Sequence, residues 1–275
     1  MSREEQTHVL HFYNWYLQME KITLEEKRNI QIGMLKEIDE FCRNNGIRYS
    51  LAFGTLIGAI RHKGFIPWDD DVDIMMPISD LMKFKKMFVS KTMKYADIDT
   101  YKHFQFCFSR IYNTQTFSKL GKFNTDMGIN IDLYVLVDIP NETVSANKFF
   151  HIAEAYEKKR YFFMKWNARV INRTPLKTIP LTDYYIRKER ESLINLNSYG
   201  KTGSFYCISG PLKGRSKQIY DRDLFKDMID VDFENLKLMS IKEYDYFLRQ
   251  EYGDYMQLPP IEERIPYHGG DYYWK

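Results

Sequence analysis

Apolar and polar residues alternate with two different periods in the first third of the chain. Between Leu24 and Asn45 the apolar residues recur at helical spacing, and Thr23 with Glu26 forms a capping-box pattern at the start of this segment. In Ile47–Phe53 every second residue is apolar, as in a strand, and Asp71–Met76 reads as a second strand. These periods predict a helix followed by two strands.

The rest of the chain continues this mixture of periods. The further expected elements are short helices over 56–62 and from 79, strands over 104–108 and 129–137, and longer helices from 145 and over 183–196. They indicate a small mixed β-sheet packed by helices, followed by a mainly helical C-terminal region. The expected fold class is therefore α+β.

This pattern suggests three parts without a clear linker between them. We expect an N-terminal helical extension over 1–23, a catalytic core over 24–140, and a helix-rich C-terminal region over 141–275 that completes the active site. The C-terminal region is expected to hold an ordered loop at 210–217.

Composition narrows the class of protein. The 275 residues carry a net charge of +3, and 44% of them are hydrophobic, so we expect a packed globular protein with no nucleic-acid partner. Aromatic residues make up 16%, which favours core mass, with a cation-binding cage as the alternative. The three cysteines are far apart and are expected to be reduced.

The longest uncharged apolar segment, Tyr49–Ile60, is too short for a membrane helix, and the N-terminus lacks a secretory pattern, so we expect a cytoplasmic protein.

Two acidic residues of the second predicted strand indicate chemistry on phosphate. Asp71 and Asp73 flank Val72, so on a strand both carboxylates point to one face, about 7 Å apart. A hard cation such as Mg²⁺, with Mn²⁺ as an alternative, offsets their repulsion and leaves coordination positions for phosphate oxygens. The alternative is a solvated acidic turn.

Two further features strengthen this interpretation. Gly54 and Thr55 end the first predicted strand and open a short helix, where backbone N–H groups and a hydroxyl can meet an anion. Asp132 is a polar residue inside an otherwise apolar strand and is the candidate third carboxylate. Each feature alone has an ordinary structural explanation, but their conjunction favours a catalytic site.

Three segments of the chain resemble a known family. GTLIGAIRHKGFIPWDDDVDIMM at 54–76, INIDLYVLVD at 129–138 and FENLKLMSIKEYDYFLRQEYGDYMQLPP at 233–260 resemble the LicD family of phosphocholine transferases, related to the fukutin-type phosphotransferases. The resemblance implies a nucleotidyltransferase-like fold, in which Gly54 and Thr55 form the glycine-hydroxyl turn. It also implies that Asp71, Asp73 and Asp132 are the metal carboxylates and catalytic residues.

The resemblance implies a reaction as well. Phosphocholine, or a related phospho-alcohol, would pass from CDP-choline or another CDP-alcohol to a hydroxyl of a cell-surface glycan or its lipid-linked precursor, with CMP leaving. Asp132 would complete the metal shell or accept the proton of the attacking hydroxyl. The alternatives are a nucleotidyltransferase that attaches a nucleoside monophosphate to a small molecule, and a catalytically silent carbohydrate- or choline-binding module.

Basic and aromatic residues supply the remaining substrate-binding candidates. Trp68 precedes the acidic run and can face a quaternary ammonium group. The other candidates for contacts to phosphate or to an anionic acceptor are Arg61, His62, Lys63, Lys213, Arg215, Arg264 and His268. The ordinary alternatives are a basic helix end, a packed turn residue and surface charge.

One basic segment of the chain has no assigned role in this reaction. The run EKKRYFFMKWNARVINR at 157–173 interleaves bases with aromatic residues on an expected helix. Such a face fits anionic lipid or a lipid-linked oligosaccharide, which would place the protein peripherally at the inner face of a membrane. A solvated helix with a buried aromatic stripe is the alternative.

Overall fold

The computed structural model describes residues 20–101, 104, 106–119, 127–139, 143–171, 180–194, 204–208, 219–265 and 270–275. The predicted N-terminal extension falls almost entirely outside these residues, and the predicted loop at 210–217 falls wholly outside them. The division into three parts stays a prediction.

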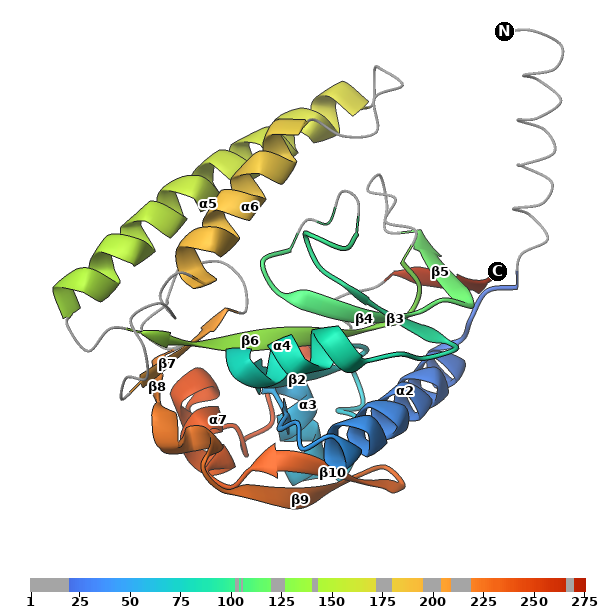
Figure 1. Ribbon diagram of the computed structural model, residues 1–275. Helices are drawn as coiled ribbons and strands as arrows, with labels where there is room; N and C mark the ends of the chain where they lie inside the picture. Colours follow the sequence, from blue (N-terminus) through green and yellow to red (C-terminus); the bar gives the residue numbers. More distant parts are fainter. Residues whose placement is uncertain are drawn as a thin grey trace, which may run out of the picture.

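A seven-stranded mixed sheet forms the centre of the molecule (Figure 1). Its main path runs β1-β2-β6-β4-β3, and β7 and β8 extend it from β6. These strands are β1 (Ser50–Leu51), β2 (Asp73–Pro77), β3 (Met93–Ala96), β4 (Ser109–Asn113), β6 (Asn130–Ile139), β7 (Ser204–Ile208) and β8 (Ile219–Asp221). The β2–β6 pair is parallel and the other pairs are antiparallel, which confirms the α+β class with a mixed sheet.

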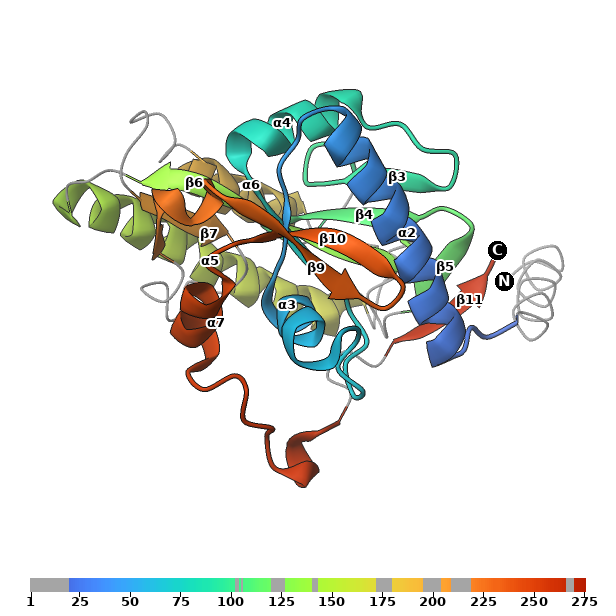
Figure 2. The same cartoon turned by 90° about the horizontal axis from the view of Figure 1, so that it is seen from below.

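Helices cover both sides of this sheet. Figures 1 and 2 show α2, α3 and α7 on one side, together with a two-stranded ribbon of β9 and β10, and α5 with α6 on the other side. The helices are α2 (Leu24–Asn44), α3 (Phe53–Ile57), α4 (Ile78–Met87), α5 (Thr143–Ile171), α6 (Pro180–Ile194) and α7 (Tyr244–Tyr252). The short helical turns are η1 (Gly58–His62), η4 (Arg222–Phe225) and η5 (Ile261–Glu263), and the outer strands are β5 (Thr116–Lys119), β9 (Met228–Phe233), β10 (Leu236–Ile241) and β11 (Asp271–Trp274).

The first helix forms as the sequence predicts. The Thr23 hydroxyl accepts a hydrogen bond from the Glu26 backbone, and the Glu26 carboxylate accepts one from the Thr23 N–H, which completes the capping box. Leu35 and Ile38 on the inner face of α2 are fully buried. The helix therefore packs its apolar stripe into the core, against β6 and β10.

Some predicted elements are displaced. The strand expected over 104–108 is wrong: Phe104, Phe106 and Phe108 pack ring against ring at 5.5 and 5.0 Å, and the ladder to β6 begins only at Ser109. Alternating phenylalanines fit such a ring cluster as well as they fit a strand. The first two predicted strands are shorter than expected, as β1 and β2, and Asp71 lies just before β2.

The C-terminal region combines the expected helices with strands that the pattern did not indicate. Helices α5 and α6 are confirmed, while β7 to β11 add strands to the described part of this region. Within the parts of the chain that the structure describes, none of the helices has an apolar stretch that would cross a bilayer.

Candidate active site

An open cavity of about 760 Å³ lies where the chain passes from β1 through α3 and η1 to β2. One wall comes from this connection, and the opposite wall comes from the end of α7 and the segment that follows it. The lining residues relevant to binding or chemistry are, from the first wall, Gly54, Arg61, Trp68, Asp69, Asp71 and Asp73. From the second wall they are Tyr252, Asp254, Tyr255 and Glu263. Two distant segments of sequence therefore build one site.

Three carboxylates of the acidic run face this cavity. Asp71 and Asp73 line it as predicted, and Asp69 joins them. Burial, and then the charge of Asp71, raises the pKa of the Asp69 carboxyl to about 7. Burial and the charges of Asp71 and Asp132 raise the pKa of Asp73 well above its ordinary value. The carboxylates are thus close enough to destabilise one another when all are ionised.

Asp69 was not singled out from the sequence, although the sequence carries a signal for it. Positions 69, 71 and 73 alternate through the acidic run, and the same alternation identified Asp71 and Asp73. Asp70, between them, turns the other way: its carboxylate pairs with Lys27 Nζ at 3.0 Å, with both side chains buried. The run therefore divides into a cavity face and a core face.

Gly54 and Thr55 support these carboxylates directly. A Cβ atom at Gly54 would lie 2.7 Å from Asp69 Oδ2, so only glycine leaves room for that carboxylate. The Thr55 hydroxyl accepts a hydrogen bond from the Asp73 backbone N–H at 2.8 Å and fixes the start of β2. The predicted contact of this turn with a phosphate stays a prediction.

Asp132 lies beside the site rather than among its lining residues. It is the register partner of Asp73 on the neighbouring parallel strand. Its carboxylate accepts two hydrogen bonds from Arg110, at 2.7 and 3.1 Å, and one from Asn130 at 2.6 Å. Arg110 in turn stacks on Phe106, 3.8 Å from the ring centroid. Arg110 was not predicted, since nothing in the local sequence pattern of β4 pairs it with Asp132.

The carboxylate group fits a hard divalent cation by its chemistry. Asp73 Oδ1 is buried without a hydrogen-bond partner, and burial together with the neighbouring carboxylates raises the pKa values of Asp69 and Asp73. Oxygen ligands of this kind suit Mg²⁺ or Mn²⁺. Among the described residues, no three His, Cys, Asp or Glu side chains are arranged as a ready metal centre.

Of the predicted basic and aromatic residues, Arg61 and Trp68 line the cavity, while Arg264 and His62 contact Trp68 without being among the lining residues. Arg264 lies over the Trp68 ring, with its guanidinium carbon 5.3 Å from the centroid, and the His62 ring meets Trp68 edge-on at 6.1 Å. Arg61 donates hydrogen bonds to the backbone carbonyls of Tyr255 and Gln257. Burial, and then the charge of Arg264, lowers the pKa of Arg61, so the two cations are close together.

Of the other predicted basic residues, the structure describes only Lys63. The backbone carbonyl of Lys63 accepts a hydrogen bond from the Glu234 N–H, and Lys63 does not line the cavity. Lys213, Arg215 and His268 fall outside the described residues.

A known protein family matches the part of the chain that forms the first wall of the cavity. Residues 46–187, about half of the protein, match the family model described as LicD/FKTN/FKRP, nucleotidyltransferase domain. The chain belongs to this family. The matched range contains Gly54, the acidic run and Asp132, and it ends before the second wall of the cavity.

Similarity to one individual protein extends over nearly the whole chain. The chain is 27% identical over 266 residues to the lipopolysaccharide cholinephosphotransferase LicD of Haemophilus influenzae, covering 91% of this chain and 97% of that protein. It is also 30% identical over 149 residues to an uncharacterized protein of Rickettsia typhi, covering 53% of this chain and 43% of that protein. The protein is thus an enzyme of the LicD type.

Proposed function

We propose that this enzyme transfers phosphocholine from CDP-choline to a hydroxyl of a lipopolysaccharide or a related surface glycan, and releases CMP. The observation that carries the proposal is the cavity in which Gly54 leaves room for three converging carboxylates, at the segment shared with the LicD family. The similarity to a cholinephosphotransferase along nearly its whole length supports the choice of choline and of a lipopolysaccharide-type acceptor.

The carboxylates have a defined part in this reaction. Asp69, Asp71 and Asp73 would hold Mg²⁺, which when bound supplies positive charge to phosphoryl oxygens. Thr55 positions Asp73 through its backbone N–H. Arg110 and Asn130 donate hydrogen bonds to the Asp132 carboxylate beside Asp73, and the charge of Asp132 contributes to the raised pKa of Asp73. A general base must accept a hydrogen bond from the attacking hydroxyl. The hydrogen bonds from Arg110 and Asn130 use the same carboxylate oxygens of Asp132 and would compete with that hydroxyl.

The rim of the cavity supports a cationic alcohol. Arg264 lies over the Trp68 ring, and this contact supports a role for the ring in binding a positive group. Tyr252, Asp254 and Glu263 add an aromatic ring and two acidic groups to the opposite wall. A trimethylammonium group would be attracted by both kinds of side chain.

Thermal stability with a donor panel tests the proposal. The wild type is melted with Mg²⁺ and CDP-choline, CDP-glycerol, CDP-ribitol, GDP-mannose or ATP, beside the double variant Asp71→Asn/Asp73→Asn. A donor at 100 times its dissociation constant stabilises the fold by about 2.7 kcal/mol, which amounts to several degrees. We expect this shift with CDP-choline and Mg²⁺ together, and its loss in the double variant.

A matched control and a product analysis complete the test. The variant Glu40→Gln/Asp223→Asn removes two exposed carboxylates away from the cavity and should keep the full shift. In turnover with a glycan acceptor, free CMP supports the proposal, whereas a nucleotide joined to the acceptor would establish a nucleotidyltransferase instead. A shift with choline alone in the absence of Mg²⁺ would point to a binding module.

A further inference from the structure

The helical pair α5 and α6 lies on the far side of the sheet from α3 and α7 (Figure 1). Several large apolar side chains of this pair are exposed. Among the described residues of the pair, the exposed ones and their exposed fractions are Ile152 (38%), Tyr161 (38%), Phe162 (65%), Leu181 (43%) and Tyr184 (50%). Isolated exposed apolar residues are ordinary, but a group on one helical pair indicates an interaction surface.

Ring contacts between the helices place two of these side chains on the same face. Phe163 and Tyr185 stack across the pair, with centroids 5.3 Å apart and planes 9° apart. Phe162 and Tyr184 each precede a member of this stacked pair by one residue. Because the helices are antiparallel, a step back on each turns both side chains to the same side of the pair.

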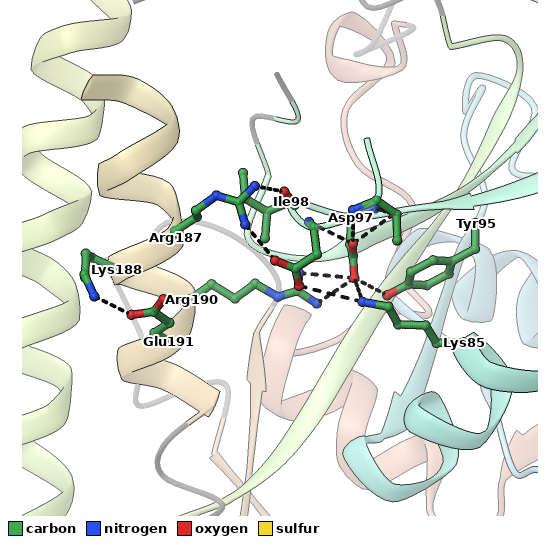
Figure 3. Close-up of polar contacts among 10 residues, drawn as sticks. Lys85, Tyr95, Asp97, Ile98, Arg187, Lys188, Arg190 and Glu191 are labelled. Carbon is green, nitrogen blue, oxygen red and sulfur yellow. Dashed lines mark hydrogen bonds and ion pairs between the residues drawn. The ribbon is translucent and has the colours of Figure 1, made fainter. Parts of the chain in front are cut away.

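The opposite face of the pair is fixed to the core. Arg160 and Glu189 join the two helices at 2.7 Å, and both are buried. Figure 3 shows Arg190 of α6 directed at the carboxylate of Asp97, which directly follows β3. Arg187 of α6 also pairs with Asp99 at 2.7 Å. These contacts hold the pair in one orientation, with Phe162 and Tyr184 turned outward.

Positive charge is concentrated on the same element. Helix α5 contains six Lys and Arg residues against two Glu, a net charge of +4, while the whole chain has a net charge of +3. Lys158 and Lys165 are exposed on α5, and Lys188 on α6 lies over the Tyr184 ring at 6.0 Å. The exposed aromatic residues thus lie among three lysines, of which Lys158 also pairs with Glu154 at 3.0 Å and Lys188 with Glu191 at 2.7 Å.

We propose that this surface docks on a lipid bilayer that contains anionic lipids. We call it the hairpin face and define it by Phe162, Leu181, Tyr184, Lys158, Lys165 and Lys188. Aromatic rings favour the boundary between headgroups and acyl chains, and lysines favour an anionic headgroup layer. The surface lies apart from the residues that line the cavity, so the inference stands independently of the proposed reaction.

Vesicle sedimentation tests the inference directly. The full chain is mixed with vesicles of phosphatidylcholine, or of phosphatidylcholine with phosphatidylglycerol, at low and at physiological salt. We expect binding to the anionic vesicles that exceeds binding to neutral ones by about tenfold or more and weakens with salt.

Three variants and a control assign the binding to the hairpin face. Phe162→Ser/Tyr184→Ser should lower the partition by about tenfold, and Lys158→Gln and Lys165→Gln by roughly fivefold each. Met82→Ser/Val89→Ser removes exposed apolar side chains elsewhere, at exposed fractions of 59% and 86%, and should bind as the wild type.

Melting curves and circular dichroism confirm that each variant is folded before it is compared. The inference is overturned if the wild type does not sediment with anionic vesicles, if it binds neutral vesicles equally well, or if the aromatic variant binds as the wild type does. Transfer to a soluble glycan acceptor should be the same in the wild type and in all these variants, so failure of the docking inference leaves the proposed reaction untouched.

Discussion

Neighbouring aspartates of the acidic run serve opposite purposes, because the backbone turns their side chains to different sides. Asp70 lies in a buried ion pair with Lys27, while Asp71 lines the cavity. We predict that Asp70→Asn loses about 3 kcal/mol of stability, since it leaves the Lys27 charge buried and unpaired. We predict that Asp71→Asn keeps its stability and loses transfer activity on the order of 100-fold or more. Urea unfolding and turnover assays on both variants check this, and the reverse assignment would contradict it.

Two glycines offer a similar contrast. At Gly54 a Cβ atom would meet the Asp69 carboxylate at 2.7 Å, whereas at Gly33, inside α2, nothing lies within 4 Å. We predict that Gly54→Ala displaces Asp69 and abolishes donor-dependent stabilisation. Gly33→Ala should instead raise stability by about 0.5 to 1 kcal/mol through helix propensity and keep activity. Melting curves with and without donor measure both effects, and an active Gly54→Ala enzyme would contradict the first.

The raised pKa of Asp69 also predicts a pH dependence. The folded protein binds this proton more tightly than the unfolded chain, in which an aspartate titrates near pH 4. Without a divalent cation, stability should therefore fall as pH rises from about 4 to about 7, where folded Asp69 loses its proton. Asp69→Asn should flatten this slope, and Mg²⁺ should oppose it. Melting in EDTA across this pH range measures the slope, and identical profiles for wild type and Asp69→Asn would contradict the prediction.

At the residue scale, the sequence predicted those site residues whose signal is local. The acidic alternation, Gly54, and the neighbours Arg61 and Trp68 all lie within 20 residues of one another, and the structure brings them to one cavity. Arg110 was missed because its contact with Asp132 depends on which strands pair, and a single sequence does not give strand order.

Elements show the same division between local and long-range information. Helix α2 was predicted from its cap and its apolar spacing, both of which are contained in the segment itself. The short strands β3, β5 and β7 were not predicted, because each gains its stability from a partner that is distant along the chain. The parallel pairing of β2 with β6 was likewise out of reach, although it decides that Asp73 and Asp132 are neighbours.

One of the contacts that attach helix α6 to the sheet involves a fully buried carboxylate. Asp97 is fully buried and pairs with Lys85 at 2.6 Å and with Arg190 at 3.4 Å (Figure 3). Burial acts to raise the pKa of Asp97, but these cations outweigh it and hold that pKa well below its ordinary value. The carboxylate is therefore ionised above about pH 4 in both states, and its stabilising effect is lost only as pH falls below that range.

We predict that Asp97→Asn costs about 3 kcal/mol of stability, because the buried Arg190 and the half-buried Lys85 lose the carboxylate that lies nearest to both of them. Amide hydrogen exchange should quicken in α6 while α2 stays protected. Asp232→Asn is the matched control: its pair with Lys237 is exposed, and its loss should stay within about 0.5 kcal/mol. Unchanged exchange in α6 would contradict the prediction.

For the whole molecule, the sheet separates two working surfaces. The carboxylate cavity is built on the side of α3 and α7, and the hairpin face belongs to the helices of the other side (Figures 1 and 2). Leu51, Ile74 and Leu133 are fully buried and form part of the apolar core between the two surfaces. Because the sheet lies between them, we expect that either surface can be altered without loss of the other.

The second wall of the cavity has a consequence for synthesis of the protein. The wall follows α7, and Arg61 holds it through the backbone carbonyls of Tyr255 and Gln257. On the ribosome, the acidic run therefore emerges about 180 residues before the segment that encloses it. A nascent chain can thus begin to form its sheet while its carboxylates stay open to water, and the cavity gains its second wall only after the segment beyond α7 has been made.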